Sequence, residues 1–232
     1  MALTKIEYGT GDTLTAEQVN EMQDAIIETE ETLGDLTGFG LGGVSTLTTD
    51  LNTNNINGWY YYGASAINRP PHIQYGCLLV VNRSGTETEV VQTAFSPVDG
   101  TKAQRTYRNR TDGWSEWEYE NPPMAVGVEY RTTERFCSKP VYIKRLSCDA
   151  MPSANSTKHI GHGISNMEYI VDFGGCMTQD GEGAISLPYY FASENQAHLS
   201  VTNENIVIVS GANNLTTYND TRVWIKYTKT TD

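Results

Sequence analysis

Near its start the chain carries apolar residues at the spacing of a helix. The apolar positions that repeat at alternating three- and four-residue steps, with Thr29 filling one step, are Val19, Met22, Ile26 and Leu33. This is the a/d stripe of a heptad repeat, and it predicts a short parallel coiled coil in which these residues hold copies of the chain together. The alternative is a surface helix packed on its own domain, although the stripe is narrower than such a helix usually presents.

Capping signals bound this helix. Thr15 with Gln18 three residues later matches a capping box, and Gly34 predicts the end of the helix. A glycine-rich stretch occupies 35–43. A second, shorter helix is predicted beyond it, because a further set of residues repeats the three- and four-residue steps, namely Val44, Leu47, Leu51 and Asn54.

From residue 57 onward the pattern changes to short runs of apolar and aromatic residues separated by turn residues, which is typical of strands. The predicted strands are 58–62, 77–81, 89–95, 106–110, 114–117, 128–131, 139–146, 168–173, 198–201, 205–210 and 221–229. Asn121-Pro122-Pro123 marks a domain boundary. The pattern predicts a mainly β chain with a helical segment at 1–56, a small α+β domain at 57–123 and a β-sandwich or barrel at 124–232. Oligomer number does not follow from so few heptads.

Composition and charge narrow the class of partner. The chain has 232 residues, 14 of them tyrosine, and a formal net charge of −12. So acidic a chain is repelled by phosphate backbones and by anionic lipid, so nucleic acid is not expected as a partner. The local exception is the basic set Arg105, Arg108 and Arg110, which is interpreted as a loop with exposed arginines.

The cysteines, the opening residues and the apolar runs indicate in which cellular compartment the chain is made. Cys77, Cys137, Cys148 and Cys176 form no C-x-x-C pair, so no zinc or redox motif is indicated. The opening residues are not those of a signal peptide, and no apolar run approaches the ~20 residues of a membrane-spanning helix. We therefore expect synthesis in a reducing bacterial cytoplasm, no membrane insertion, and cysteines that are small buried hydrophobic residues.

One part of the chain resembles a known module. The residues in question are Gly58-Trp59-Tyr60, Asn68-Arg69-Pro70, Gly76, Val91-Gln92, Tyr107-Arg108 and Gly113-Trp114-Ser115-Glu116-Trp117. Together they are similar to the knob domain of phage tail fibres and of R-type pyocin fibres, and the closing G-W-S-x-W is the most specific piece. The resemblance implies a knob domain at 57–123.

The two ends of the chain also resemble virion fibre proteins. The C-terminal segments are 127–134, 139–142, 162–166 and 224–230, and the N-terminal one is 11–16. In fibres of this kind the C-terminal part is usually a β-sandwich within a homotrimer, and the N-terminal part attaches to a tail, baseplate or head protein. The resemblance implies the same arrangement here, in a short fibre without a repeated shaft. The helical segment at 1–56 would then be a virion-attachment and trimerisation segment, and residues 124–232 would be a β-sandwich tip domain.

Signals for catalysis are weak. No nucleophile elbow, P-loop or dinucleotide fingerprint is present. The acidic residues that a glycan-cleaving spike would need are available as Asp172, Asp180, Glu182 and Glu194, but nothing fixes their separation. His159 and His162 are three residues apart in a segment interpreted as a loop; a metal between subunits at the trimer axis is the remaining alternative to ordinary loop and core histidines. We therefore expect no catalytic residue, no metal and no cofactor.

Candidate ligand-binding residues are better represented than catalytic ones. Tyr189 and Tyr190 follow a glycine-rich turn, and a long polar loop with Asn213, Asn214 and Tyr218 is predicted between two strands. Aromatic faces framed by amides are typical of sugar-binding surfaces, and loops on a rigid sandwich are where recognition usually lies. Against this, most aromatic side chains in β proteins pack in the core or between subunits.

The function expected from these features is adhesion. The chain is predicted to be a phage fibre and receptor-binding protein, a homotrimer located in the virion, that fixes the particle to a host surface glycan or protein. The alternatives are a purely structural head-fibre or baseplate element and, less favoured, a glycan-cleaving tail spike.

Overall fold

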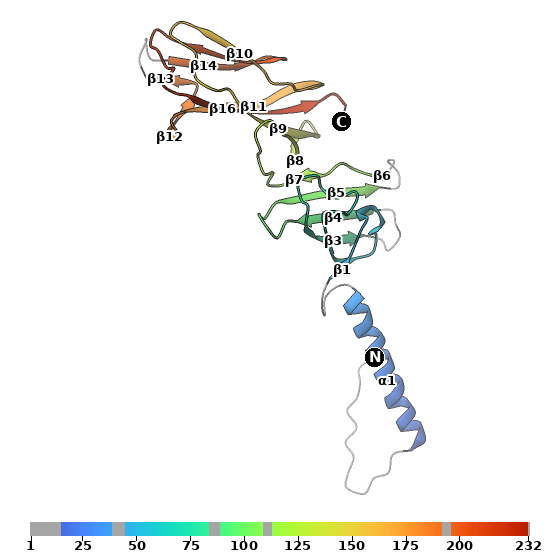
Figure 1. Cartoon of the computed structure of the whole chain (residues 1–232). Coiled ribbons are helices and arrows are strands. Elements are labelled where there is room, and N and C mark those ends of the chain that lie inside the picture. The colour runs from blue at the N-terminus through green and yellow to red at the C-terminus, as the bar shows by residue number, and fades with distance from the viewer. Residues whose placement is uncertain (1–14, 39–44, 84–88, 109–112, 192–195, 232) are drawn as a thin grey trace.

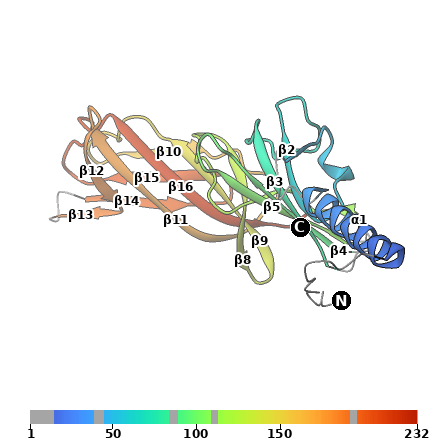
Figure 2. The ribbon, with the colours of Figure 1, turned by 90° about the horizontal axis from the view of Figure 1, so that it is seen from below.

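The molecule is elongated, with a helix at one end and strands throughout the rest (Figure 1). The computed structural model describes residues 15–38, 45–83, 89–108, 113–191 and 196–231, with the backbone alone at 32–38. The predicted mainly β composition is confirmed. Figure 2 shows the same arrangement from below, with the helix at the opposite end of the molecule from β12 and β13.

Helix α1 (Ala16–Gly38) begins as predicted and ends later. The Thr15 hydroxyl accepts a hydrogen bond from the Gln18 backbone N at 3.2 Å, and the Gln18 side chain accepts one from the Thr15 N at 2.9 Å, which is a reciprocal capping box. The predicted stop at Gly34 is wrong, because the helix continues for another turn to Gly38. A glycine inside a helix costs only about 1 kcal/mol, which the neighbouring turns can offset.

The predicted second helix over 44–54 is also wrong. β1 (Thr46–Leu47) pairs in parallel with the next strand, and a single 3₁₀ turn follows at Leu51–Thr53. The Asp50 side chain caps that turn by accepting the backbone N of Asn52 at 2.9 Å. β-Branched threonines around Leu47 favour extended backbone, and Leu51, fully buried, fills the core instead of a helix stripe. Val44 lies outside the described residues.

The strands form two groups along the chain. The first group is β2 (Gly58–Tyr62), β3 (Gly76–Asn82), β4 (Glu89–Phe95), β5 (Lys102–Arg108), β6 (Gly113–Trp114) and β7 (Glu118–Tyr119). The second group is β8 (Glu129–Phe136), β9 (Lys139–Ser147), β10 (Thr157–Gly161), β11 (Met167–Gln179), β12 (Glu182–Leu187), β13 (Tyr189–Tyr190), β14 (Gln196–Val201), β15 (Asn205–Ser210) and β16 (Asp220–Lys229). The predicted strands at 58–62, 89–95 and 205–210 are confirmed to the residue, and the other predicted strands overlap observed ones.

Two sheets result. The longer one runs β1-β2-β3-β4-β5-β7-β8-β9-β16-β11-β12, with β6 paired to β5, and the shorter one runs β10-β15-β14-β13. The longer sheet is continuous across the predicted boundary at 121–123. The strands on either side of that boundary, β7 and β8, are joined by a single parallel residue pair, Tyr119 with Thr132. The division of the chain at that boundary stays a prediction. In the described residues of 57–123 every regular element is a strand, so the helix expected of an α+β domain does not occur among them.

Each half of the long sheet covers its own core. The first core gathers buried residues of β2 to β5 with Leu51, Trp117 and Tyr130. The second lies where the shorter sheet packs on the far half of the longer one, with Leu199 and Ile208 on one side. Two sheets that share one core in this way have the layering of a β-sandwich.

Strand β9 belongs to both cores. Ile143 packs into the first core, whereas its neighbours in the strand, Tyr142 and Leu146, pack against the second. Because successive side chains of a strand point to opposite faces, one strand can serve two cores. The halves are thus joined by shared packing as well as by the chain.

Two sequence expectations about surface residues need correction. Arg105 is not in an exposed loop, because it is buried within β5, where its guanidinium lies 4.2 Å from the ring centroid of Trp114 and 4.5 Å from that of Trp117. Arg108 also lies in β5, and Arg110 is outside the described residues. All four cysteines are unpaired; Cys148 is buried as expected, whereas Cys176 is half-buried and Cys77 and Cys137 are exposed. Within the described residues, no helix is long and apolar enough to span a membrane.

Candidate functional site

The end of the molecule farthest from α1 is built by loops and by the short strand β13 (Figure 1). The backbone N of Gly211 donates to the Gln196 carbonyl at 2.8 Å, and Gln196 is the sheet partner of Tyr190. The start of the polar segment 211–219 therefore lies one strand away from β13. We call the residues 188–191, 196–198 and 211–219 the tip surface.

A pocket of about 210 Å³ opens on the tip surface. It is lined by Pro188, Tyr189, Tyr190, Gln196, Ala197 and His198. Tyr190 is 73% exposed and the adjacent Phe191 is 76% exposed, although side chains of this size normally bury most of their surface. An amide, an imidazole and uncovered aromatic rings around one hollow suit a ligand with both polar edges and an apolar face, such as a sugar.

The predicted binding residues are brought together only in part. Tyr189 and Tyr190 line the pocket, although Tyr189 also packs against the second core. Tyr218 packs against that core as well, and its backbone carbonyl accepts the N of Met151 at 2.9 Å. Asn213 and Asn214 are exposed but are not among the lining residues of the pocket.

Sequence reasoning missed three residues of the tip surface. Phe191, Gln196 and His198 were not singled out, although the strand alternation of 196–201 places Gln196 and His198 on the same face. That alternation was the available signal. The pairing of β13 with β14, which brings them beside the tyrosines, is a tertiary contact that the pattern does not contain.

The two histidines do not form a pair. The predicted loop at 159–162 is wrong for His159, which lies in β10 and is exposed. His162 is 2% exposed; its Nδ1 accepts the backbone N of Ile164 at 3.1 Å and its Nε2 lies 3.2 Å from the carbonyl of Thr202, to which it donates. Both ring nitrogens of His162 are thus engaged with backbone. Across the described residues, no group of three potential metal-ligating side chains is found.

The acidic residues weighed for glycan cleavage are dispersed. Asp172 lies within β11 and Glu182 begins β12. Asp180 stands in the turn between these strands, where its carboxylate accepts the Asn219 amide at 2.8 Å and its backbone N donates back to that side chain at 3.0 Å. This reciprocal bond holds the turn to the tip segment. Glu194 lies outside the described residues.

At the other end, the helix presents the predicted stripe to solvent. Val19, Met22 and Ile26 are 39%, 52% and 56% exposed, and the side chain of Leu33 lies outside the described residues. Apolar side chains at heptad spacing are what an interhelical seam requires, and Ile27, 53% exposed beside Ile26, adds an apolar residue next to the stripe.

A second apolar surface lies on the first half of the long sheet, on the face opposite its core. Cross-strand pairs such as Trp59 with Leu79 and Val81 with Val91 place its members side by side. We call it the outer apolar face; its members are Leu47, Trp59, Tyr61, Cys77, Leu79, Val81, Val91 and Phe95. Apolar side chains that lie side by side on the outer face of a sheet, interrupted here by Thr93, are a candidate interaction surface.

Comparisons with known proteins find similarity among solved structures alone. No protein family and no curated protein matches the sequence. Among solved structures the chain is similar to an N-truncated R2-type pyocin tail fibre, at 10% identity and a TM-score of 0.27, over 79% of this chain and 96% of that one. It is also similar to C-terminal parts of the Pseudomonas aeruginosa R1 and R2 pyocin fibres, at 12% and 10% identity and TM-scores of 0.26, covering 79% of this chain and 65% of those chains. At such identities and TM-scores these likenesses carry no argument about function.

Proposed function

We propose that the chain is a fibre subunit of a bacterial virus tail or a related particle, that it works as a homotrimer, and that it binds a cell surface rather than catalysing a reaction. The observation that carries this proposal is the separation of two kinds of exposed surface in one elongated molecule. Helix α1 and strand β13 lie toward opposite ends of the molecule (Figure 1). The helix carries an exposed apolar heptad stripe, and β13 carries the exposed ring of Tyr190, which lines a pocket.

Self-association is argued from the helix. Identical parallel helices in register bring each of Val19, Met22 and Ile26 opposite its own copy, so a heptad stripe is complementary to itself. The outer apolar face follows α1 closely in the chain and adds a second surface for the same partner. A trimer carries three tip surfaces, and a multivalent contact gains avidity without any new interaction.

Light scattering after size exclusion tests the oligomer. The expected mass is three times 25.7 kDa, about 77 kDa. Val19→Asp with Ile26→Asp places charges in the stripe and should reduce the trimer fraction, whereas Asn20→Asp with Gln23→Asp adds the same charge beside the stripe and should not. If the stripe variant stays trimeric, Val81→Asp with Val91→Asp tests the outer apolar face. A monomeric unmodified protein would refute the proposal.

Adhesion is tested on cells. Fluorescently labelled protein is incubated with a panel of bacterial strains, and binding is measured by flow cytometry for the unmodified protein, Tyr190→Ala and Tyr75→Ala. Tyr75 is the matched control because it is also exposed and lies outside the tip surface. The tip proposal expects loss of binding with Tyr190→Ala alone. Binding to no strain, by a protein that is still trimeric, would favour a purely structural virion component, and release of sugar from a bound strain would favour a cleaving spike.

A further inference from the structure

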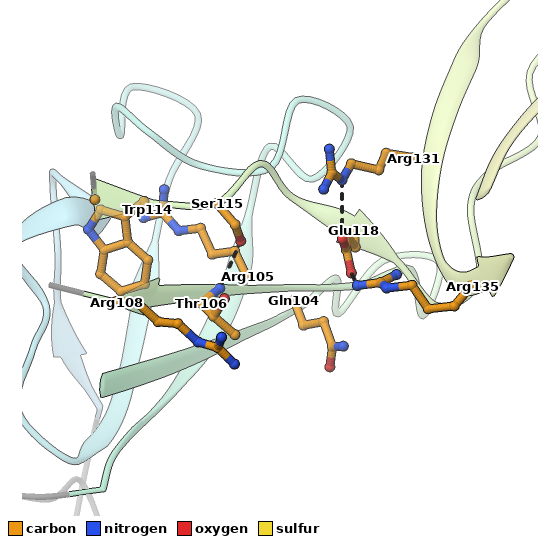
Figure 3. Close-up of a pocket in the computed structure, with 10 residues that line it drawn as sticks. Gln104, Arg105, Thr106, Arg108, Trp114, Ser115, Glu118, Arg131 and Arg135 are labelled. Atoms are coloured by element: carbon orange, nitrogen blue, oxygen red, sulfur yellow. Dashed lines mark hydrogen bonds and ion pairs between the residues drawn. The ribbon is translucent and has the colours of Figure 1, made fainter. Parts of the chain in front are cut away.

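A groove of about 360 Å³ lies on the long sheet where β5, β7 and β8 meet (Figure 3). Its lining residues, which we call the arginine groove, are Gln104, Arg105, Thr106, Arg108, Gly113, Trp114, Ser115, Glu118, Arg131 and Arg135. Gln104, Thr106 and Arg108 alternate along β5, so they share one face of the strand, and all three are exposed. At about 3.4 Å per residue this row is about 14 Å long, longer than a single ion needs.

The charge of the groove is opposite to that of the chain. The charge presented there is a formal +2, from Arg108, Arg131 and Arg135 against Glu118, in a protein whose formal net charge is −12. Arg105 is not counted, because it is buried on the opposite face of β5. The surrounding negative charge is screened over about 8 Å at physiological ionic strength, so an anion that reaches the groove responds mainly to the groove itself.

The arginines are held in place. The Glu118 carboxylate receives Arg131 Nε at 3.1 Å on one oxygen and Arg135 Nη2 at 2.7 Å on the other (Figure 3). Arg131 Nη1 also donates to the hydroxyl of Tyr142 at 3.2 Å, and Arg135 Nη1 donates to the carbonyl of Glu134 at 3.2 Å. A guanidinium fixed in this way loses little conformational freedom when it meets a ligand.

Strand β5 beneath the row is also held from its opposite, buried face. Arg105 packs its guanidinium against two tryptophan rings, one of them Trp114 of the groove, and donates from Nε to the Gln92 side chain at 2.9 Å. Ser115 accepts the Thr106 backbone N at 3.0 Å, which fixes the wall beside the row. The groove therefore combines guanidinium groups, an amide and a hydroxyl with one aromatic ring.

We propose that the arginine groove binds a short stretch of acidic glycan. The arginines donate hydrogen bonds to its carboxylate or phosphate groups, and Gln104 and Thr106 form hydrogen bonds with its sugar hydroxyls. Planar guanidinium groups match both kinds of anion in paired hydrogen bonds. The length of the row favours a chain of linked units over a free ion. This site lies outside the tip surface and goes beyond the adhesion proposed above, because it stands whether or not the tip binds a receptor.

The test titrates full-length protein with defined probes and follows tryptophan fluorescence, to which Trp114 contributes, together with heat of binding. Tetragalacturonate supplies carboxylates, a glycerol phosphate tetramer supplies phosphates, maltotetraose is the neutral control, and a short single-stranded DNA is the polyanion of another class. Binding of either acidic glycan, without binding of maltotetraose, is expected, and the stronger of the two identifies the anion.

Variants locate the binding. Arg108→Gln removes one cation, and Gln104→Glu adds an anion with almost no change in volume; each should weaken binding about tenfold, the loss of one charged hydrogen bond. Arg83→Gln changes the charge as much as Arg108→Gln but lies outside the groove, with an 80% exposed side chain, and should change binding less than about twofold. The proposal is overturned if neither acidic glycan binds, if Arg83→Gln weakens binding as much as Arg108→Gln, or if DNA binds as tightly as the glycans.

Discussion

Glu118 is the residue whose replacement we expect to cost the most stability for the least change in shape. It lies in β7, its side chain is 8% exposed, and its carboxylate joins this strand to Arg131 and Arg135 of β8. The two strands share only the residue pair Tyr119 and Thr132. Glu118→Gln keeps the volume and removes the charge.

The expected loss of unfolding free energy depends on how deeply each of the two guanidinium groups is buried. The Arg131 side chain is 19% exposed, so without a carboxylate it is a largely buried and uncompensated charge, a loss in the range of about 3 kcal/mol. The Arg135 side chain is 45% exposed and can turn to water, so its share is below about 1 kcal/mol. We therefore expect Glu118→Gln to lower the free energy of unfolding by about 3 kcal/mol.

Urea unfolding followed by tryptophan fluorescence measures this loss. Arg83→Gln breaks the ion pair with Glu89 on the surface and should cost less than about 0.5 kcal/mol. In a double-mutant cycle, Glu118→Gln with Arg131→Gln should be at least about 1 kcal/mol less costly than the sum of the two single changes, because the orphaned charge is gone. A loss below about 1 kcal/mol for Glu118→Gln would refute the view that this carboxylate clamps β7 to β8.

Three further changes test packing and burial. Gly175→Ala should cost about 1–3 kcal/mol in urea unfolding, because its Cβ would lie 2.9 Å from a backbone oxygen of β16, whereas Gly161→Ala meets nothing within 4 Å and should be neutral. Burial raises the pKa of the Cys148 thiol to about 11, so iodoacetamide followed by mass spectrometry should modify exposed Cys77 first, and equal rates would contradict the packing. Burial raises the pKa of Tyr119 to about 12, against about 10 in the unfolded chain. The urea concentration at the unfolding midpoint should therefore fall as the pH increases above about 10, and an increase would contradict this burial.

Much of the fold was predictable where one face of a strand is buried. The segments 89–95 and 205–210 were located to the residue as short runs of strand-forming residues, and in the structure every second residue of each is buried. The start of α1 was predictable for a similar reason, because the Thr15 and Gln18 capping box is a local signal with a local cause.

The misses occurred where a tertiary contact overrode a local pattern. Leu47 and Leu51 have helical spacing, but one lies in a strand paired with β2 and the other fills the first core. The glycine-rich segment of β12 carries no apolar alternation, and its pairing with β11 makes it a strand. Such pairings involve residues distant in sequence, and spacing alone does not encode them.

One candidate site contains residues that were named from the sequence, whereas the other is assembled by tertiary contacts. Tyr190 was expected in a loop after a turn signal; the structure places it in strand β13, where it is exposed. The arginine groove was not, because its members Arg108, Glu118 and Arg135 belong to three strands that only the sheet order brings together. The alternation of Gln104, Thr106 and Arg108 was a usable sign of an exposed polar row, but it was masked by the reading of the arginines as a loop.

The position of the arginine groove gives the proposed ligand a structural consequence. One wall comes from β5, which covers the first core, and the other from Arg131 and Arg135 of β8, which continues through β9 into the second core. An anion held by both walls therefore joins the two halves of the molecule at the point where the sheet has a single residue pair. Because a ligand that binds only the folded arrangement stabilises it by mass action, acidic glycan should stiffen this junction as well as occupy it.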